Sequence, residues 1–271
     1  MNKFIKLLFA LTTSILISFS QSVAGELVIK GSTTVLPIAQ KAAEAYMAEN
    51  PDVKISLSGG GSGNGIKAII DGTADIGNAS RFIKQKEVDL AVTKQVYPVP
   101  FRVALDAIVP VVNNKNNLSD LTMAQLRDIY MGKIKDWKEV GGTPGQIVVI
   151  SRDSSSGTFG VWKDLVMKKE RVIPSALTVP SNGGIVQAVI STPGAIGYVG
   201  LGYLNSAIKA VSVEGVLGTE ENTLNGTFPI SRGLFMFTKG WPGGDTMGFI
   251  SFILSKNGQK LVKEAGSIPV F

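Results

Sequence analysis

Short apolar runs rich in β-branched residues alternate along the chain with longer stretches in which apolar side chains recur every three or four residues. The short runs predict buried strands, and the longer stretches predict amphipathic helices. Strands are expected over residues 26–30, 53–58, 76–79, 107–113, 147–151, 196–199 and 231–238, and helices over residues 37–49, 65–71, 85–93, 122–131, 157–168, 184–190, 245–255 and 258–265. Strands alternating with helices through short Gly-rich connections are typical of an α/β fold with parallel strands.

Two apolar stretches are long enough to pass from one part of the protein to another. They cover residues 103–113 and 225–237. If both are strands that cross between two lobes, residues 25–106 and 233–271 form lobe 1, and residues 107–232 form lobe 2. A ligand would then lie in the cleft between the lobes, where binding sites of α/β folds are commonly found.

Residues 1–24 have the composition of a targeting segment. Two lysines precede an apolar run at residues 7–19, and Ser22-Val23-Ala24 places small residues before Gly25. This order predicts a signal peptide that is cleaved before Gly25. An uncleaved membrane anchor is the alternative, although the run is shorter than the roughly 20 residues that span a bilayer. Since no Cys follows the run, a lipoprotein anchor is excluded, and export to a bacterial periplasm is expected.

The composition excludes several classes of site. The 271 residues include no Cys and no His. The chain therefore has no disulfide, no Cys or His zinc site and no Ser-His-Asp or Cys-His catalytic group. We expect no metal or cofactor and no enzymatic activity.

The charge is mildly basic. The formal net charge of +6 falls to +4 when the two lysines of the targeting segment are removed. No long run of Lys and Arg is present, so nucleic-acid binding is not expected, and a small anionic ligand fits better.

Three Ser/Thr/Gly clusters each follow an apolar run and precede a predicted helix. They lie at residues 31–34, 59–65 and 154–158. A helix N-terminus carries unpaired N–H groups and a partial positive charge, while hydroxyls add donors and glycines allow close approach of a ligand. One such cluster could be an ordinary N-cap, but three of them favour convergence on one anion.

Three further polar residues follow predicted strands. Arg152 stands at the end of an apolar run and could bind an oxyanion through paired hydrogen bonds, or form a salt bridge with a neighbour such as Asp153. Ser80 is a plausible hydroxyl donor. Arg81 could bind the anion or pair with an acid across the cleft. At Asn182, which opens another predicted helix, capping is the expected role.

Taken together, these segments resemble the periplasmic phosphate-binding proteins of Pst-type ABC transporters. The matching segments are residues 31–34 with Pro37, 59–65 with Lys67, 75–81, Arg152 with 156–158, and 193–199. The resemblance implies a type II periplasmic binding protein fold, which is two α/β lobes joined by two crossing strands with the ligand in the cleft. It also implies a monomer that binds inorganic phosphate and delivers it to an inner-membrane ABC permease. The phosphate donors that it implies are Thr33 with Ser32 beside it, Ser62, Arg152, Ser156, Gly157 and Thr158.

One position departs from the family pattern. Ser80 stands where well-known members carry an Asp that accepts the proton of hydrogen phosphate. A carboxylate there repels fully ionised sulfate, whereas a hydroxyl can accept or donate. Asp106 and then Asp153 are the candidate replacement acceptors.

Other functions remain alternatives. A binding protein for another tetrahedral oxyanion, such as sulfate, molybdate or tungstate, is compatible with Ser80. An enzyme acting on phosphate esters, or an extracellular sensor or adhesion protein, could use the same fold. The lack of His, Cys and a metal-binding acidic cluster weighs against the enzyme.

Overall fold

The computed structural model describes residues 26–271, so the predicted signal peptide at residues 1–24 lies outside the described residues. The strands are β1 (Glu26–Gly31), β2 (Lys54–Ser58), β3 (Ile76–Ala79), β4 (Val99–Asn113), β5 (Asp120–Leu121), β6 (Val148–Arg152), β7 (Leu177–Val179), β8 (Ala195–Gly200), β9 (Ile208–Ala210), β10 (Ser212–Val213) and β11 (Ser231–Thr238). The helices are α1 (Leu36–Glu49), α2 (Ser62–Ile70), α3 (Gln85–Thr93), α4 (Met123–Tyr130), α5 (Gly157–Leu165), α6 (Asn182–Ser191), α7 (Glu220–Leu224), α8 (Gly244–Ile253) and α9 (Lys256–Glu264), with 3₁₀ turns at Trp137–Val140 and Leu201–Tyr203.

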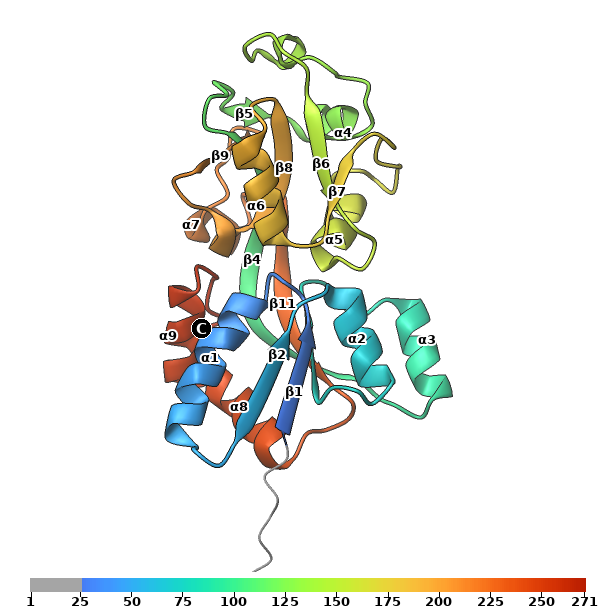
Figure 1. Cartoon of the computed structure of the whole chain (residues 1–271), viewed down its shortest axis with the longest axis vertical. Helices are drawn as coiled ribbons and strands as arrows, with labels where there is room; N and C mark the ends of the chain where they lie inside the picture. The colour runs from blue at the N-terminus through green and yellow to red at the C-terminus, as the bar shows by residue number, and fades with distance from the viewer. Residues whose placement is uncertain (1–25) are drawn as a thin grey trace, which may run out of the picture.

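Two α/β lobes lie end to end, and β4 and β11 run through the narrow region between them (Figure 1). The main sheet has the order β2-β1-β3-β11-β4-β8-β6-β7, with β9 also paired to β4. Strand β4 pairs with β11 up to Ala107 and with β8 from Ile108 onward. One continuous strand therefore belongs to the sheets of both lobes.

The first lobe buries both faces of its sheet. Helices α1, α8 and α9 pack on one face around Ile29, Ile38 and Phe249, while α2 and α3 cover the other face around Ile66 and Phe237. All five of these side chains are buried. This two-sided cover explains why all four residues of β3 are buried.

The second lobe is built around an aromatic cluster. The rings of Trp162 and Tyr198 stack with centroids 4.3 Å apart and an interplanar angle of 9°, and Tyr130 packs against both. Helix α6 covers the opposite face of the sheet through Ile185 and Val189. This packing fixes β6 and the start of α5, which follows it.

The predicted arrangement of two α/β lobes joined by two crossing strands is confirmed, but some element boundaries were wrong. Strand β4 begins at Val99 rather than residue 107, and α2 begins at Ser62 rather than residue 65. The short elements β5, β7, β9, β10 and α7 carry too little periodicity to be predicted. The lobe boundaries at residues 106 and 233 stay a prediction. Within residues 26–271, no helix combines the length and the apolar character that a bilayer-spanning segment needs.

Candidate functional site

The three Ser/Thr/Gly clusters meet where the two lobes touch. The Gly63 N–H of the first lobe donates to the Ser155 carbonyl of the second lobe at 2.8 Å, and the Ser155 Oγ lies 3.0 Å from the Gly60 carbonyl. At the start of α5, a Cβ added to Gly157 would lie 2.6 Å from the Ser80 Oγ. The structure therefore brings the predicted clusters together across a closed interlobe seam.

In the first lobe, the turn before α1 presents a row of buried hydroxyls. The Ser32 Oγ accepts the Thr34 N–H at 3.2 Å, which closes a local turn. The Asn182 Nδ2 of the second lobe donates to the Thr33 Oγ1 at 3.1 Å and to the Thr34 Oγ1 at 3.0 Å. The Tyr203 hydroxyl donates to the Thr33 carbonyl at 2.5 Å. These bonds join the turn to the second lobe.

Ser62 and Ser80 form a second hydroxyl pair in the first lobe. The Ser62 Oγ accepts the Ser80 N–H at 2.9 Å, and the two hydroxyl oxygens are 3.3 Å apart. Both side chains are buried. Since either hydroxyl can donate to the other, this pair can offer a neighbouring ligand a donor or an acceptor.

The second lobe contributes the N-terminus of α5. The Ser156 Oγ accepts the Phe159 N–H at 3.1 Å as the N-cap, so its own proton stays available for donation. The Thr158 Oγ1 lies 3.1 Å from the Thr34 Oγ1 across the seam. The helix dipole adds partial positive charge at this point.

Arg152 is held rigidly at the end of β6. Its side chain is buried, its Nε donates to the Val179 carbonyl at 3.1 Å, and its Nη2 donates to the Pro180 carbonyl at 2.9 Å. Its Nη1 has no hydrogen-bond partner among residues 26–271. Burial lowers the pKa of Arg152, although an arginine stays protonated at neutral pH. The salt bridge with Asp153 is not what holds it, because Asp153 accepts instead from the backbone N–H and hydroxyl of Ser155.

Asp106 does not have a free carboxylate. Its Oδ1 accepts the Leu201 N–H at 2.9 Å, and its Oδ2 accepts from the Arg232 Nε at 2.9 Å and Nη2 at 2.7 Å. This geometry does not favour Asp106 as the replacement acceptor, since three of about four lone-pair sites on its carboxylate already accept from protein donors. Ser80 is left as the better placed acceptor.

Arg81 pairs within its own lobe rather than across the cleft. Its Nη1 and Nη2 donate to the two carboxylate oxygens of Glu87 at 2.8 and 2.6 Å. Hydrogen bonds from Arg81 lower the pKa of Glu87 against the opposing effect of burial. This bidentate pair fixes the start of α3 beside the seam.

Sequence reasoning missed Arg232 and underrated Asn182. Both are buried, and both contact hydroxyls of the first-lobe turn. The available signal for Arg232 was a charged residue near the start of an otherwise apolar strand. Asn182 was read as a helix cap, but Ser181 is the residue that caps α6.

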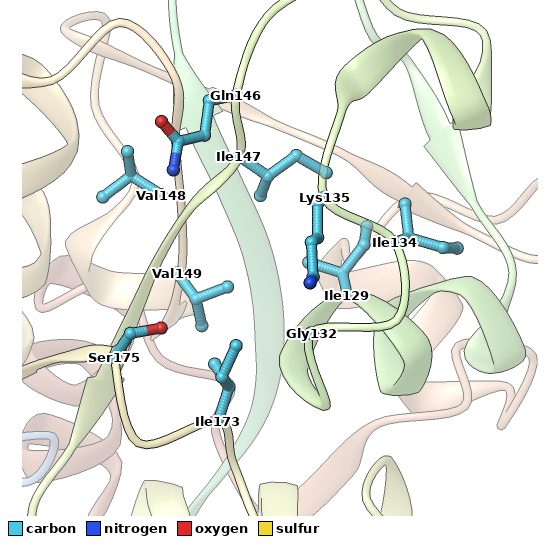
Figure 2. A pocket seen from close by; sticks show the side chains of 10 residues that line it. All are labelled: Ile129, Gly132, Ile134, Lys135, Gln146, Ile147, Val148, Val149, Ile173 and Ser175. Carbon is cyan, nitrogen blue, oxygen red and sulfur yellow. The ribbon is translucent and has the colours of Figure 1, made fainter.

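A separate hollow of about 330 Å³ lies in the second lobe between α4, β6 and the segment near Ile173. Figure 2 shows that most of its lining side chains are aliphatic, with Lys135, Gln146 and Ser175 as the polar exceptions. None of the predicted site residues lines it.

Comparison with known proteins shows the family of the chain. Residues 18–257 match the family model described as the PBP superfamily domain. The phosphate-binding protein PstS of Bacillus subtilis is 33% identical over 92% of this chain and 82% of its own length. The chain belongs to the Pst-type phosphate-binding protein family.

Solved structures support the same family. The chain is 35% identical, with a TM-score of 0.86, to a putative phosphate ABC transporter substrate-binding protein from Clostridium perfringens with bound phosphate, over 91% of this chain and all of that one. It is 33% identical, with a TM-score of 0.74, to an ABC-type phosphate transport receptor from Vibrio cholerae, over 89% of this chain and 99% of that one. The type II periplasmic binding protein fold of the Pst-type family is thereby confirmed for this chain.

Proposed function

We propose that the protein binds inorganic phosphate between its lobes and delivers it to an inner-membrane ABC permease for uptake. The observation that carries this proposal is the convergence of hydroxyls from both lobes, the N-terminus of α5 and the buried Arg152 at one seam. The relatives named as phosphate-binding proteins, one of them solved with bound phosphate, support phosphate as the anion.

The proposed ligand groups come from both lobes. The first lobe supplies Ser32, Thr33, Ser62 and Ser80, and the second lobe supplies Arg152, Ser156, Gly157 and Thr158. Each hydrogen bond to the charged anion would contribute about 1.5–3 kcal/mol. Preorganisation of the donors limits the entropy cost of binding.

The other parts of the proposal follow from the sequence. Residues 1–24 direct export and are removed, and the released protein acts in the periplasm as a monomer. Residues 25–106 with 233–271, and residues 107–232, form the two lobes that close on the anion. The protein performs no catalysis and binds no nucleic acid.

A second candidate is the binding of another tetrahedral oxyanion. The observation that favours it is Ser80, whose hydroxyl can donate to sulfate as readily as it accepts from phosphate. The closing of two lobes on the anion is common to both candidates.

Calorimetry on the mature chain tests the proposal. The protein is unfolded and refolded to remove any bound anion, then titrated with phosphate and with sulfate at the same salt concentration and pH. One-to-one binding of phosphate is expected. A preference for sulfate or molybdate would support the second candidate. If no oxyanion gave a heat of binding, the three clusters would act only as helix caps.

A further inference from the structure

Arg232 lies on the floor of the seam and uses every donor that it has. Its Nε and one Nη2 proton go to the Asp106 Oδ2, the other Nη2 proton goes to the Thr34 Oγ1 at 3.3 Å, and Nη1 donates to the Ser80 carbonyl at 3.1 Å and the Thr158 Oγ1 at 3.0 Å. A guanidinium has five N–H groups, and all five are accounted for. Arg232 is therefore committed to protein partners and does not itself bind the anion.

Asp106 holds this guanidinium in place. The two residues are directly opposite each other on β11 and β4, and their side chains form an ion pair at 2.7 Å that is almost completely buried. Burial lowers the pKa of Arg232, and the Asp106 charge counteracts that effect. The pair lies on the two strands that link the lobes, so its position is fixed by the hinge itself.

The hydrogen bonds between the hydroxyls around Arg232 can be donated in only one direction. The Thr34 Oγ1 accepts from the Arg232 Nη2 and from the Asn182 Nδ2, which fills both of its lone pairs. The proton of Thr34 must then be the one shared with Thr158 across 3.1 Å. The Thr158 Oγ1 consequently accepts twice, from Arg232 and from Thr34. Its own proton is therefore free to be donated to a ligand in the seam.

Asn182 imposes the same direction on Thr33. Its two amide protons reach the Thr33 and Thr34 hydroxyls, and its backbone N–H lies 3.4 Å from the Thr33 Oγ1. The Gly200 N–H donates to the Asn182 Oδ1 at 3.4 Å, which fixes the amide orientation. Thr33, like Thr158, is left with a proton to give and no lone pair to offer.

We propose that Arg232 and Asn182 are positioning residues that make the Thr33 and Thr158 hydroxyls obligate donors, so that a ligand proton must be accepted by a serine hydroxyl such as those of the Ser62–Ser80 pair. This inference rests on the proposed function and deepens it. Hydroxyls that can only donate favour the dianion HPO₄²⁻, which has a single proton to place, over the monoanion H₂PO₄⁻, which has two.

The test compares phosphate affinity in Arg232→Lys, Thr158→Val and the double variant, each measured above and below the second pKa of phosphate. Lysine keeps the charge beside Asp106 but cannot reach Ser80, Thr34 and Thr158 together. We expect Arg232→Lys to bind phosphate about 10- to 100-fold more weakly at the higher pH, the range for losing one charged hydrogen bond. Arg171→Lys, an exposed arginine in the second lobe, is the matched control and should bind as the unaltered protein does.

Two readouts separate positioning from a purely structural role. Because Arg232 acts through Thr158, the losses in the double variant should be clearly less than the product of the two single losses. The fall in affinity at low pH should also be shallower in Arg232→Lys, because the freed Thr158 lone pair can accept the second proton of the monoanion.

The inference would be overturned if the loss of affinity in the double variant equalled the product of the two single losses and the pH profile of Arg232→Lys were unchanged. Phosphate binding by Arg232→Lys as tight as that of the unaltered protein would also overturn it. If Arg232→Lys does not fold, Arg232→Met with Asp106→Leu removes both charges together and avoids an unpaired buried carboxylate. The non-additivity with Thr158→Val and the pH profile of phosphate affinity are then measured in this variant instead. Absence of phosphate binding by the unaltered protein is a different result, since it would overturn the proposed function before any variant is compared.

Discussion

The backbone of Gly157 lies directly against the hydroxyl of Ser62, although the two residues belong to different lobes. A Cβ at position 157 would come into overlap with the Ser62 Oγ and would lie 2.6 Å from the Ser80 Oγ. The start of α5 can therefore meet the first lobe only because residue 157 has no side chain. Shape at this point matters as much as hydrogen bonding.

Replacing Gly157 with Ala should hold the lobes apart. We expect phosphate affinity to fall at least about 100-fold, because the donors of the two lobes can no longer converge, while each lobe stays folded. Calorimetry and small-angle scattering with and without phosphate measure the two effects. Gly183→Ala is the control, since it also lies at a helix start and its Cβ would meet the Ser181 Oγ at an ordinary 3.8 Å. Compaction of Gly157→Ala on adding phosphate would contradict the expectation.

Replacing Arg152 with Lys should weaken binding without unfolding the protein. The guanidinium is anchored by the Val179 and Pro180 carbonyls, and Nη1 is the donor left over among the described residues. A lysine cannot keep both anchors and still present a donor to the anion. We expect a loss of about 10- to 100-fold in phosphate affinity. A thermal unfolding midpoint near that of the unaltered protein, measured without phosphate, would separate loss of contact from loss of fold.

The parts of the site that sequence could predict are those with a local chemical pattern. The clusters that contain Thr33, Ser62 and Ser156 are rich in Ser, Thr and Gly, which predicts the start of a helix at each of them. An α/β fold then predicts that these helix starts lie close together. Arg232 and Asn182 have no such pattern, because their roles depend on partners more than a hundred positions away in the chain, such as Thr34. Asp106 was noticed, but its pairing with Arg232 comes from the register of β4 and β11, which the sequence does not reveal.

The same division holds for the fold. Strand β1 is visible through the apolar residues 27–29 at its centre. The start of β4 at Val99 was missed because residues 99–102 are only half-buried or exposed and include a proline at position 100. A proline within an apolar run argues against a strand unless one side of the strand is free of ladder bonds.

Tyr198 should make the protein sensitive to alkaline pH. Its ring is stacked on Trp162, its hydroxyl lies 3.1 Å from the Ser151 Oγ, and burial raises its pKa to about 12. Because the folded pKa lies above the unfolded value near 10, the neutral phenol contributes stability below pH 10, and this is lost as the pH rises towards about 12. The full loss is about 2–3 kcal/mol for a shift of this size.

Unfolding in urea between pH 8 and pH 12 measures this effect. We expect Tyr198→Phe to be less stable at pH 8, because the hydrogen bonds to Ser151 and Arg152 are lost. Its free energy of unfolding should then fall less steeply than that of the unaltered protein above pH 10. Burial also raises the pKa of Tyr130, so part of the slope should remain in the variant. Parallel curves for the two proteins would show that Tyr198 does not titrate in the folded state.

Replacing Ser80 with Asp should increase discrimination between phosphate and sulfate. The Ser62–Ser80 pair can present either a proton or a lone pair to the anion, whereas a carboxylate can only accept. A fully ionised sulfate then has no proton to offer, and its charge faces that of the aspartate. We expect sulfate affinity to fall by at least about 100-fold more than phosphate affinity, which corresponds to about 3 kcal/mol of discrimination. Competition between the two anions, measured in the same buffer for Ser80→Asp and Ser80→Ala, checks this. If both variants lose phosphate and sulfate in equal proportion, Ser80 does not face the protonated oxygen of the ligand, and the acceptor must be sought elsewhere in the seam.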